Sequence, residues 1–268
     1  MIKLYMKQRV AKCIAKRVAI VGKFSREFDE CRTAVKKYGN CHIQIVSSRP
    51  EIVISFGGDG TFLKAEARYP GVPKLAVREA REYGACKTSR LSQILPLLAC
   101  EKYHKVSYLK LACTVRRKRK IIAAAEALNE ITLRNKNLGC ALRYRLMVNK
   151  KAQGGRGRQH EIIGDGVVVA TPFGSSGYYS SIARRTFRRG IGIAHNNSTN
   201  IIPPHVTHEK SRVRINILRE EGQLCADNQR RVVKVAAGDT ITIAAAKRPA
   251  IVLQKTKEQS HDALFWYV

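Results

Sequence analysis

The first hundred residues alternate between short apolar runs and segments with helical periodicity. Arg17–Gly22 is apolar and β-branched, as in a buried strand, and Ser25–Gly39 follows with an N-cap serine and a C-terminal glycine. The same alternation continues with strands predicted over Cys41–Val46 and Glu51–Phe56 and helices over Thr61–Tyr69 and Thr88–Cys100. This order predicts an α/β domain with a Rossmann-like parallel sheet covered by helices.

Beyond the last of these helices the pattern changes to a series of β-rich runs. A basic turn at Arg116–Lys120 separates two long ones, and one short helix is expected after Thr171. The runs cover Lys105–Val115, Lys120–Leu133, Leu142–Val148, Gly166–Thr171, Val213–Leu218, Arg231–Val235 and Thr240–Ala244. We therefore expect an α/β domain over residues 1–98 and a mainly β domain over 99–246, with segment 247–268 a candidate to return to the first.

The composition is that of a globular protein with an unusually high positive charge. Of its 268 residues 44% are hydrophobic, which is enough for a core, and the formal net charge is +30. Such a charge attracts any polyanion and does not choose among them. We interpret Arg116–Lys120 and Arg184–Arg189 as solvated faces, so the charge allows nucleic-acid or anionic-surface binding but does not predict either. A nucleic-acid-binding surface would have aromatic residues among its cations, and Arg116–Lys120 contains none.

Several classes of protein and site are disfavoured. No apolar run is long enough to span a membrane, and the basic N-terminus lacks the apolar core of a secretory signal, so we expect a cytoplasmic protein. No two of the eight cysteines have CxxC spacing, which argues against zinc, and we expect reduced thiols. His195, His205 and His208 fit no common zinc pattern and are interpreted as structural.

The sharpest local motif is Gly-Gly-Asp-Gly-Thr at residues 57–61, between a predicted strand and a predicted helix. Glycines there allow positive φ and close approach of backbone N–H groups to phosphate, and the helix N-terminus favours an anion. Asp59 suits a general base toward a hydroxyl, or a partner for Mg²⁺ on the phosphates. A plain turn remains the alternative. No GxxxxGK[ST] phosphate loop is present, and Gly190-Ile-Gly192 lacks the third glycine of a dinucleotide fingerprint.

Three motifs in order carry a resemblance to a known family. Residues 57–61 resemble the signature of NAD kinases, shared more loosely with diacylglycerol, sphingosine and phosphofructokinase-type kinases. Asn129-Glu130 resembles their Asn-Asp/Glu pair, and residues 164–178 resemble their long Gly-Asp-Gly to Tyr motif. Residues 190–197 resemble the archaeal branch, and the resemblance covers roughly 17–245. It implies an NAD kinase-like fold.

The resemblance also implies roles for single residues. Asp59 would be the catalytic base for the 2′-hydroxyl of the adenosine ribose of NAD, and Gly57, Gly58, Gly60 and Thr61 would face the phosphates. The residues implied to bind NAD are Asp59, Gly60, Lys64, Asn129, Glu130, Asp165, Ser176, Gly177, Tyr178, Ser181 and Gln229. Among these, Asn129 and Glu130 would hold ribose hydroxyls, and Asp165 would reach the nicotinamide end from a neighbouring subunit.

The implied activity is an NAD kinase that makes NADP from NAD with ATP or polyphosphate as donor. Mg²⁺ is expected on the donor phosphates, with no metal assigned to protein side chains, and a homodimer or homotetramer is expected. Two alternatives stay open. A lipid kinase of the same superfamily would have an apolar entry and would not need residues 164–178. A basic nucleic-acid-binding protein on an inactive kinase fold would have aromatics among its basic runs.

Overall fold

The computed structural model describes residues 16–22, 29, 32–33, 43–77, 103–153 and 161–255. These residues form two compact units. The first takes the described residues up to Val106 together with those from Ile251 onward, and the second takes those within Ser107–Ala250. Within this described part, no helix is long and apolar enough to cross a membrane.

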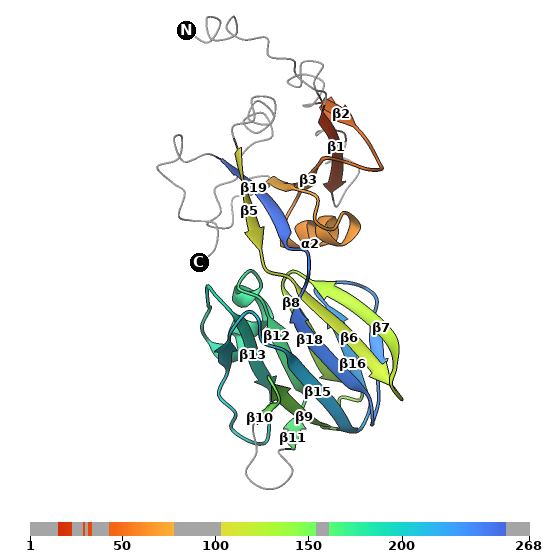
Figure 1. Ribbon diagram of the computed structural model, residues 1–268, viewed down its shortest axis with the longest axis vertical. Helices are drawn as coiled ribbons and strands as arrows, with labels where there is room; N and C mark the ends of the chain where they lie inside the picture. The colour runs from red at the N-terminus through yellow and green to blue at the C-terminus, as the bar shows by residue number, and fades with distance from the viewer. Residues whose placement is uncertain are drawn as a thin grey trace, which may run out of the picture. The chain divides into compact units, whose positions relative to one another are not determined.

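The first unit is built on a six-stranded sheet with the order β2-β1-β3-β4-β19-β5 (Figure 1). The strands are β1 (Lys16–Gly22), β2 (Ile43–Ile45), β3 (Ile52–Phe56), β4 (Lys74–Val77), β5 (Tyr103–Tyr108) and β19 (Ala250–Lys255). The pairs β1–β2, β1–β3, β3–β4 and β4–β19 are all parallel. Every residue of β3 is buried, as expected for a central strand of a covered parallel sheet, and helix α2 (Asp59–Arg68) follows it directly.

The second unit is a sandwich of two mainly antiparallel sheets. One has the order β10-β9-β15-β18-β6-β7, with β11 paired to β9, and the other has the order β14-β13-β12-β8-β16-β17. The strands of the first are β6 (Leu111–Arg117), β7 (Lys120–Ala127), β9 (Leu142–Val148), β10 (Lys151–Gln153), β11 (Ile162–Gly164), β15 (Val213–Arg219) and β18 (Thr240–Ala245). Those of the second are β8 (Glu130–Asn135), β12 (Gly166–Ala170), β13 (Ile191–Asn196), β14 (His205–Thr207), β16 (Gly222–Ala226) and β17 (Val233–Val235).

The main core lies between these two sheets, where alternate residues of the facing strands meet. Leu111, Leu146, Ile215 and Ile241 come from one sheet, and Ile131 from the other, with exposures of 1% or less. The outer face of the second sheet is covered by the short helical segments η2 (Ser175–Tyr179) and α4 (Ser180–Ala183). These segments are the short helix expected after β12.

The predicted strands over 17–22, 51–56 and 142–148 are confirmed, and α2 begins two residues before the predicted Thr61. Two long predicted runs were wrong in extent. Lys105–Val115 breaks at Leu109–Lys110 because the chain passes there from one sheet to another, and Lys120–Leu133 breaks at Leu128–Asn129. The helix predicted over 25–39 is described only at residues 29 and 32–33, which are helical, and the one over 88–100 lies outside the described residues.

Candidate nucleotide-binding site

The first unit places the glycine motif between the end of β3 and the start of α2. Gly57 has φ 139°, and a Cβ added there would lie 2.7 Å from Thr61 Oγ1, so this position needs glycine on two counts. Gly58 is the N-cap, and its carbonyl accepts from the N–H groups of Thr61 at 2.9 Å and Phe62 at 3.2 Å. The strand therefore turns sharply into a helix whose N-terminus lies beside the turn.

The first turn of α2 carries the predicted reacting groups. Asp59, Gly60 and Lys64 are exposed, whereas Thr61 is buried, so its hydroxyl faces Gly57 and not solvent. A helix N-terminus favours an anion there, because its backbone N–H groups and macrodipole carry positive potential. The local arrangement thus offers an anion a glycine turn, with a carboxylate at the start of the helix and a lysine five residues further along it.

In the second unit, a half-buried carboxylate holds the turn between β7 and β8. Asp227 accepts hydrogen bonds from the backbone N–H groups of Leu128 at 2.8 Å, Asn129 at 2.8 Å and Glu130 at 3.2 Å. Burial raises the pKa of Asp227, and the three N–H donors lower it. Its own backbone has φ 49°, which is uncommon for a residue other than glycine. Asp227 therefore fixes the backbone at the point where the predicted strand 120–133 breaks.

Thr171 holds the same turn from the other side. Its N–H donates to the Asn129 carbonyl at 2.8 Å and its hydroxyl to the Leu128 carbonyl at 2.5 Å. The Thr171 hydroxyl also accepts from the Gly174 N–H at 3.1 Å. Asp227 thus binds the N–H groups of this turn and Thr171 binds its carbonyl groups. The backbone that carries Asn129 and Glu130 is therefore rigidly placed.

Two side-chain oxygens of this rigid turn have no hydrogen-bond partner among the described residues. They are Asn129 Oδ1 and Glu130 Oε2, and both are buried. A buried oxygen acceptor left unpaired costs free energy, so each is suited to a donor such as a sugar hydroxyl. Burial, and secondarily the charge of Asp227, raises the pKa of Glu130 to about 7.

The raised pKa of Glu130 predicts a pH-dependent stability. The folded state holds this proton more tightly than the unfolded chain does, so the free energy of unfolding falls as the pH rises from about 4.5 to about 7. We expect Glu130→Gln to remove this penalty and to be more stable than the parent by ~1–3 kcal/mol above pH ~7, with no such gain near pH ~4. Denaturant unfolding at both pH values measures it, and an equal difference at both would contradict it.

Gly174 lies against the same turn and leaves no room for a side chain. A Cβ there would lie 2.4–2.5 Å from the backbone of Asn129. We expect Gly174→Ala to push the turn aside and to lower the free energy of unfolding by ~1–3 kcal/mol. Gly139→Ala is the matched control, because its Cβ would meet only Asn137 Oδ1 at 3.6 Å. Thermal unfolding of the two variants compares them, and equal midpoints would contradict this assignment.

The segment with Ser176, Gly177, Tyr178 and Ser181 follows directly as η2 and α4. A Cβ on Gly177 would lie 3.5 Å from Glu130 Oε2, so η2 passes beside the unpaired carboxylate oxygen. Gly177 interrupts the helical backbone, with φ −86° and ψ −128°. The Ser181 hydroxyl donates to the Tyr178 carbonyl at 2.7 Å, and Tyr178 is half-buried. The structure therefore brings this segment together with the Asn129 turn, as a wall with one partly open aromatic ring.

Two other residues predicted to bind NAD, Gln229 and Asp165, are placed differently from the residues of the Asn129 turn. Gln229 Nε2 donates to the Glu126 carbonyl at 3.1 Å, so this amide fastens the loop after β16 to β7. Asp165 precedes β12 at the end where Gly166 pairs with Arg134, whereas Ala170 at the other end pairs with Glu130. The separation of four strand residues corresponds to about 13 Å. Within one chain, Asp165 is therefore remote from the Asn129 turn.

The surroundings of His195 fit the prediction that it is a structural residue. It is buried, its Nδ1 lies 2.7 Å from the Tyr144 hydroxyl, and burial lowers its pKa to about 4. Across the described ranges no group of three or more histidine, cysteine or acidic residues could hold a metal. The cysteines described as free thiols are Cys113, Cys140 and Cys225.

Sequence reasoning missed Asp227, Thr171 and Gly174 as determinants of this site. Each acts through its contacts with the backbone of residues 128–130, which are distant in sequence and meet only in the folded sandwich. The available signal was the run Asp227-Asn228-Gln229, because Asp and Asn favour turns and tolerate positive φ.

Comparison with known proteins supports the resemblance in sequence and in fold. NAD kinase 1 of Listeria monocytogenes is 31% identical over 152 residues, which are 54% of this chain and 54% of that protein. Yeast NADH kinase complexed with NADH superimposes with a TM-score of 0.79 and 16% identity, over 91% of this chain and 84% of that one. An Archaeoglobus fulgidus NAD kinase in complex with ATP gives a TM-score of 0.69 and 18% identity, over 90% and 94%.

The two structural matches show that the chain has the same fold as these NAD and NADH kinases. The predicted resemblance to the NAD kinase family is confirmed. No family model matches the chain. In sequence, the chain spans about half the length of the first curated relatives that it matches. Relatives occur among bacterial and archaeal proteins, so the archaeal branch stays a prediction.

Proposed function

We propose that this chain is an NAD kinase, which transfers a phosphoryl group to the 2′-hydroxyl of the adenosine ribose of NAD to give NADP. The observation that carries the proposal is the rigid turn of the second unit, where Asn129 Oδ1 and Glu130 Oε2 are buried without a partner among the described residues. The adenosine ribose carries two neighbouring hydroxyl groups, of which the 3′-hydroxyl can donate to one of these oxygens throughout the transfer, while the proton of the 2′-hydroxyl goes to Asp59. Tyr178, beside this turn, offers a ring that can wall the adenine.

In the proposed reaction, the chain positions the hydroxyl and accepts its proton. Asn129 and Glu130 orient the ribose, and Asp59 takes the proton of the 2′-hydroxyl as that oxygen bonds to the phosphorus of the donor. Gly57, Gly58 and Gly60, at the N-terminus of α2, accommodate phosphate, and Lys64 adds a positive charge one turn further on. The bond from phosphorus to the leaving phosphate of the donor breaks in the same transfer.

We propose ATP as the donor by similarity to the Archaeoglobus relative, whose structure contains ATP. Polyphosphate remains the second donor to test. We propose that Mg²⁺ is bound to the donor phosphates, where it would offset their charge. No step assigned to the residues above depends on a protein-bound metal.

The test is formation of NADP from NAD by the full chain with Mg²⁺ and ATP, and separately with polyphosphate, followed by an NADP-specific dehydrogenase. We expect NADP with at least one of these donors and none without a donor. Absence of NADP with both, from a chain that is folded by circular dichroism, would refute the proposal.

We also propose that the enzyme is a homo-oligomer whose sites are completed between subunits. The resemblance implies this role for Asp165, and its position at the far end of β12 keeps its carboxylate away from the ribose that its own Asn129 turn would hold. Mixing inactive Asp165→Asn and Asp59→Asn chains should restore part of the activity, since some hybrid sites would hold both native carboxylates. No recovery after verified subunit exchange would contradict this arrangement.

A further inference from the structure

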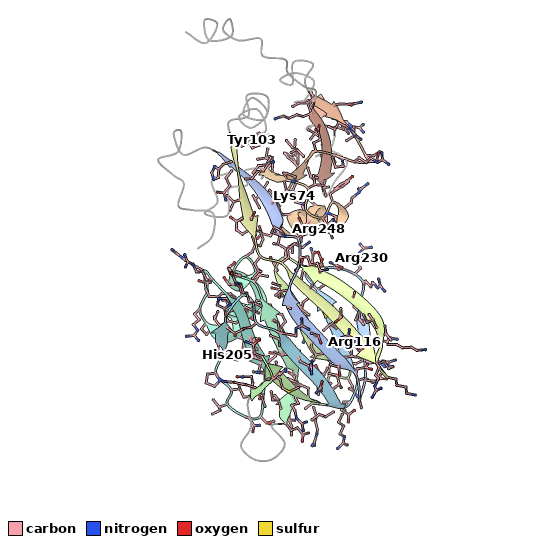
Figure 2. All side chains as sticks on the ribbon, viewed as in Figure 1. Lys74, Tyr103, Arg116, His205, Arg230 and Arg248 are labelled. Carbon is pink, nitrogen blue, oxygen red and sulfur yellow. The ribbon has the colours of Figure 1, made fainter. Side chains whose placement is uncertain are left out.

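One side of the sandwich carries a basic hairpin and exposed aliphatic side chains that the proposed kinase reaction does not use. The turn from β6 to β7 contains Arg116, Arg117, Lys118, Arg119 and Lys120, and all five are exposed. Figure 2 labels Arg116 and Arg230 on the side of the second unit that carries β7. We call this the β7 side, defined by Arg116–Ile122 and the loop Arg230–Val232.

A β-bulge brings two isoleucines to the surface of this side. Ile121 pairs with Arg116, but the next pair is Ala123 with Val115, so Ile122 is the extra residue. The extra residue interrupts the alternation, and both neighbours are exposed, Ile121 by 57% and Ile122 by 42%. Val232 is a third exposed aliphatic residue, at 43%, and its loop is fastened to β7 through the bond from Gln229 to the Glu126 carbonyl.

The cations on the β7 side are mostly uncompensated, whereas the nearby acids are neutralised. Among the described residues, no side-chain hydrogen bond or ion pair is formed by Arg116, Lys118, Arg119, Lys120, Arg230 or Arg231. Glu126 pairs with Lys110 at 2.7 Å, Asp239 with Arg117 at 2.7 Å, and Glu221 with Lys136. The surface therefore combines free positive charge with aliphatic side chains that can enter an apolar medium.

We propose that the β7 side docks on an anionic lipid membrane, with its cations on the headgroups and Ile121 and Ile122 at the acyl boundary. Two other occupants fit less well. A second copy would bring like charges together, and the bulge and lysines blunt strand pairing at this edge. A nucleic acid would favour aromatic residues for stacking, and residues 116–126 and 229–235 contain none.

The charge arm of the test compares two hairpin tips of the same sheet. The experimental variant is Lys118→Gln with Arg119→Gln, where the parent residues have φ 45° and 68°. The matched control is Lys150→Gln with Lys151→Gln, at the β9–β10 turn on the opposite edge, where Asn149 and Lys150 have φ 50° and 70°. Both variants lose two cations from a similar turn, but only the first loses them beside exposed isoleucines.

Binding of the full chain is measured by co-sedimentation with vesicles of phosphatidylglycerol and phosphatidylcholine, and with pure phosphatidylcholine. We expect binding to the anionic vesicles alone, weakened by salt, and an affinity about tenfold or more lower in the tip variant but little changed in the control. Ile121→Thr with Ile122→Thr, which keeps β-branching, is expected to weaken binding by about threefold or more. Retained NADP formation and thermal midpoint confirm that each variant folds.

Three results would overturn the proposal. The first is equal loss of vesicle binding in the tip variant and in the control, which would indicate a diffuse charge effect. The second is unchanged binding in the isoleucine variant, which would leave a purely electrostatic contact. The third is tight RNA binding that the tip variant abolishes, with no binding to the anionic vesicles. A failure here leaves the proposed kinase function untouched, because the two are measured separately.

Discussion

Replacing Asp59 with Asn is expected to lower the rate of NADP formation by about 10²- to 10⁴-fold, which is the range of a lost general base. The amide keeps the shape and exposure of the side chain in the first turn of α2 but cannot accept the proton of the 2′-hydroxyl. NAD affinity and the thermal midpoint should stay nearly the same. Steady-state kinetics and calorimetric NAD titration of the same preparation measure both.

The matched control for this variant is Glu51→Gln, which removes one carboxylate at the opposite end of β3. Glu51 Oε2 accepts from the Arg17 N–H at 2.8 Å, and an amide oxygen can take the same bond. Its activity should stay close to that of the parent chain. If Asp59→Asn retained the parent turnover, or if Glu51→Gln lost as much, Asp59 would not be the base.

The second large effect is expected from Asp227→Asn. An amide nitrogen would face one of the three N–H groups that the carboxylate now accepts, so the Leu128–Glu130 turn should loosen. We expect the free energy of unfolding to fall by ~1–3 kcal/mol, as for hydrogen bonds to a charged group. NAD affinity should fall by about tenfold or more, because Asn129 and Glu130 would no longer be held in place. A tenfold loss corresponds to ~1.4 kcal/mol of binding free energy.

Asp239→Asn separates this positioning role from general stability. Asp239 is a second carboxylate of the same sandwich that accepts hydrogen bonds from a backbone N–H; it is buried, and it accepts from the Ala236 N–H at 2.9 Å and from Arg117. Its replacement should destabilise the chain comparably while leaving NAD affinity intact. A comparable loss of NAD affinity in both variants would mean that Asp227 acts only through stability.

The parallel sheet of the first unit could be predicted from sequence because its buried strands are locally distinct. Residues 17–22 and 51–56 are apolar and β-branched, and the glycine motif after Phe56 marks the change to a helix. In the second unit, β13 was not predicted as a strand, although all but its last residue is buried. Its sequence, Ile-Gly-Ile-Ala-His-Asn, has no polar alternation, because Ile191 and Ile193 pack in the main core on one face while Ala194 packs under η2 and α4 on the other.

Several residues of the candidate site could be predicted from the sequence, but the contacts that hold them in place could not. Asn129, Glu130 and Tyr178 were found from ordered motifs, and the structure brings the Asn129 turn together with η2. The supports at Thr171, Gly174 and Asp227 depend on strand pairings between segments up to ninety-nine residues apart. Local sequence carries no direct record of such pairings, so the rigid backbone of this site appears only in the folded chain.

The proposed function depends most on binding of the adenosine ribose by the turn at Asn129 and Glu130. A crystal structure of the chain with NAD tests this directly. We predict ribose hydroxyls within hydrogen-bond distance of Asn129 Oδ1 and the Glu130 carboxylate, with the adenine beside Tyr178. NAD bound elsewhere, with both oxygens still without a partner, would contradict it.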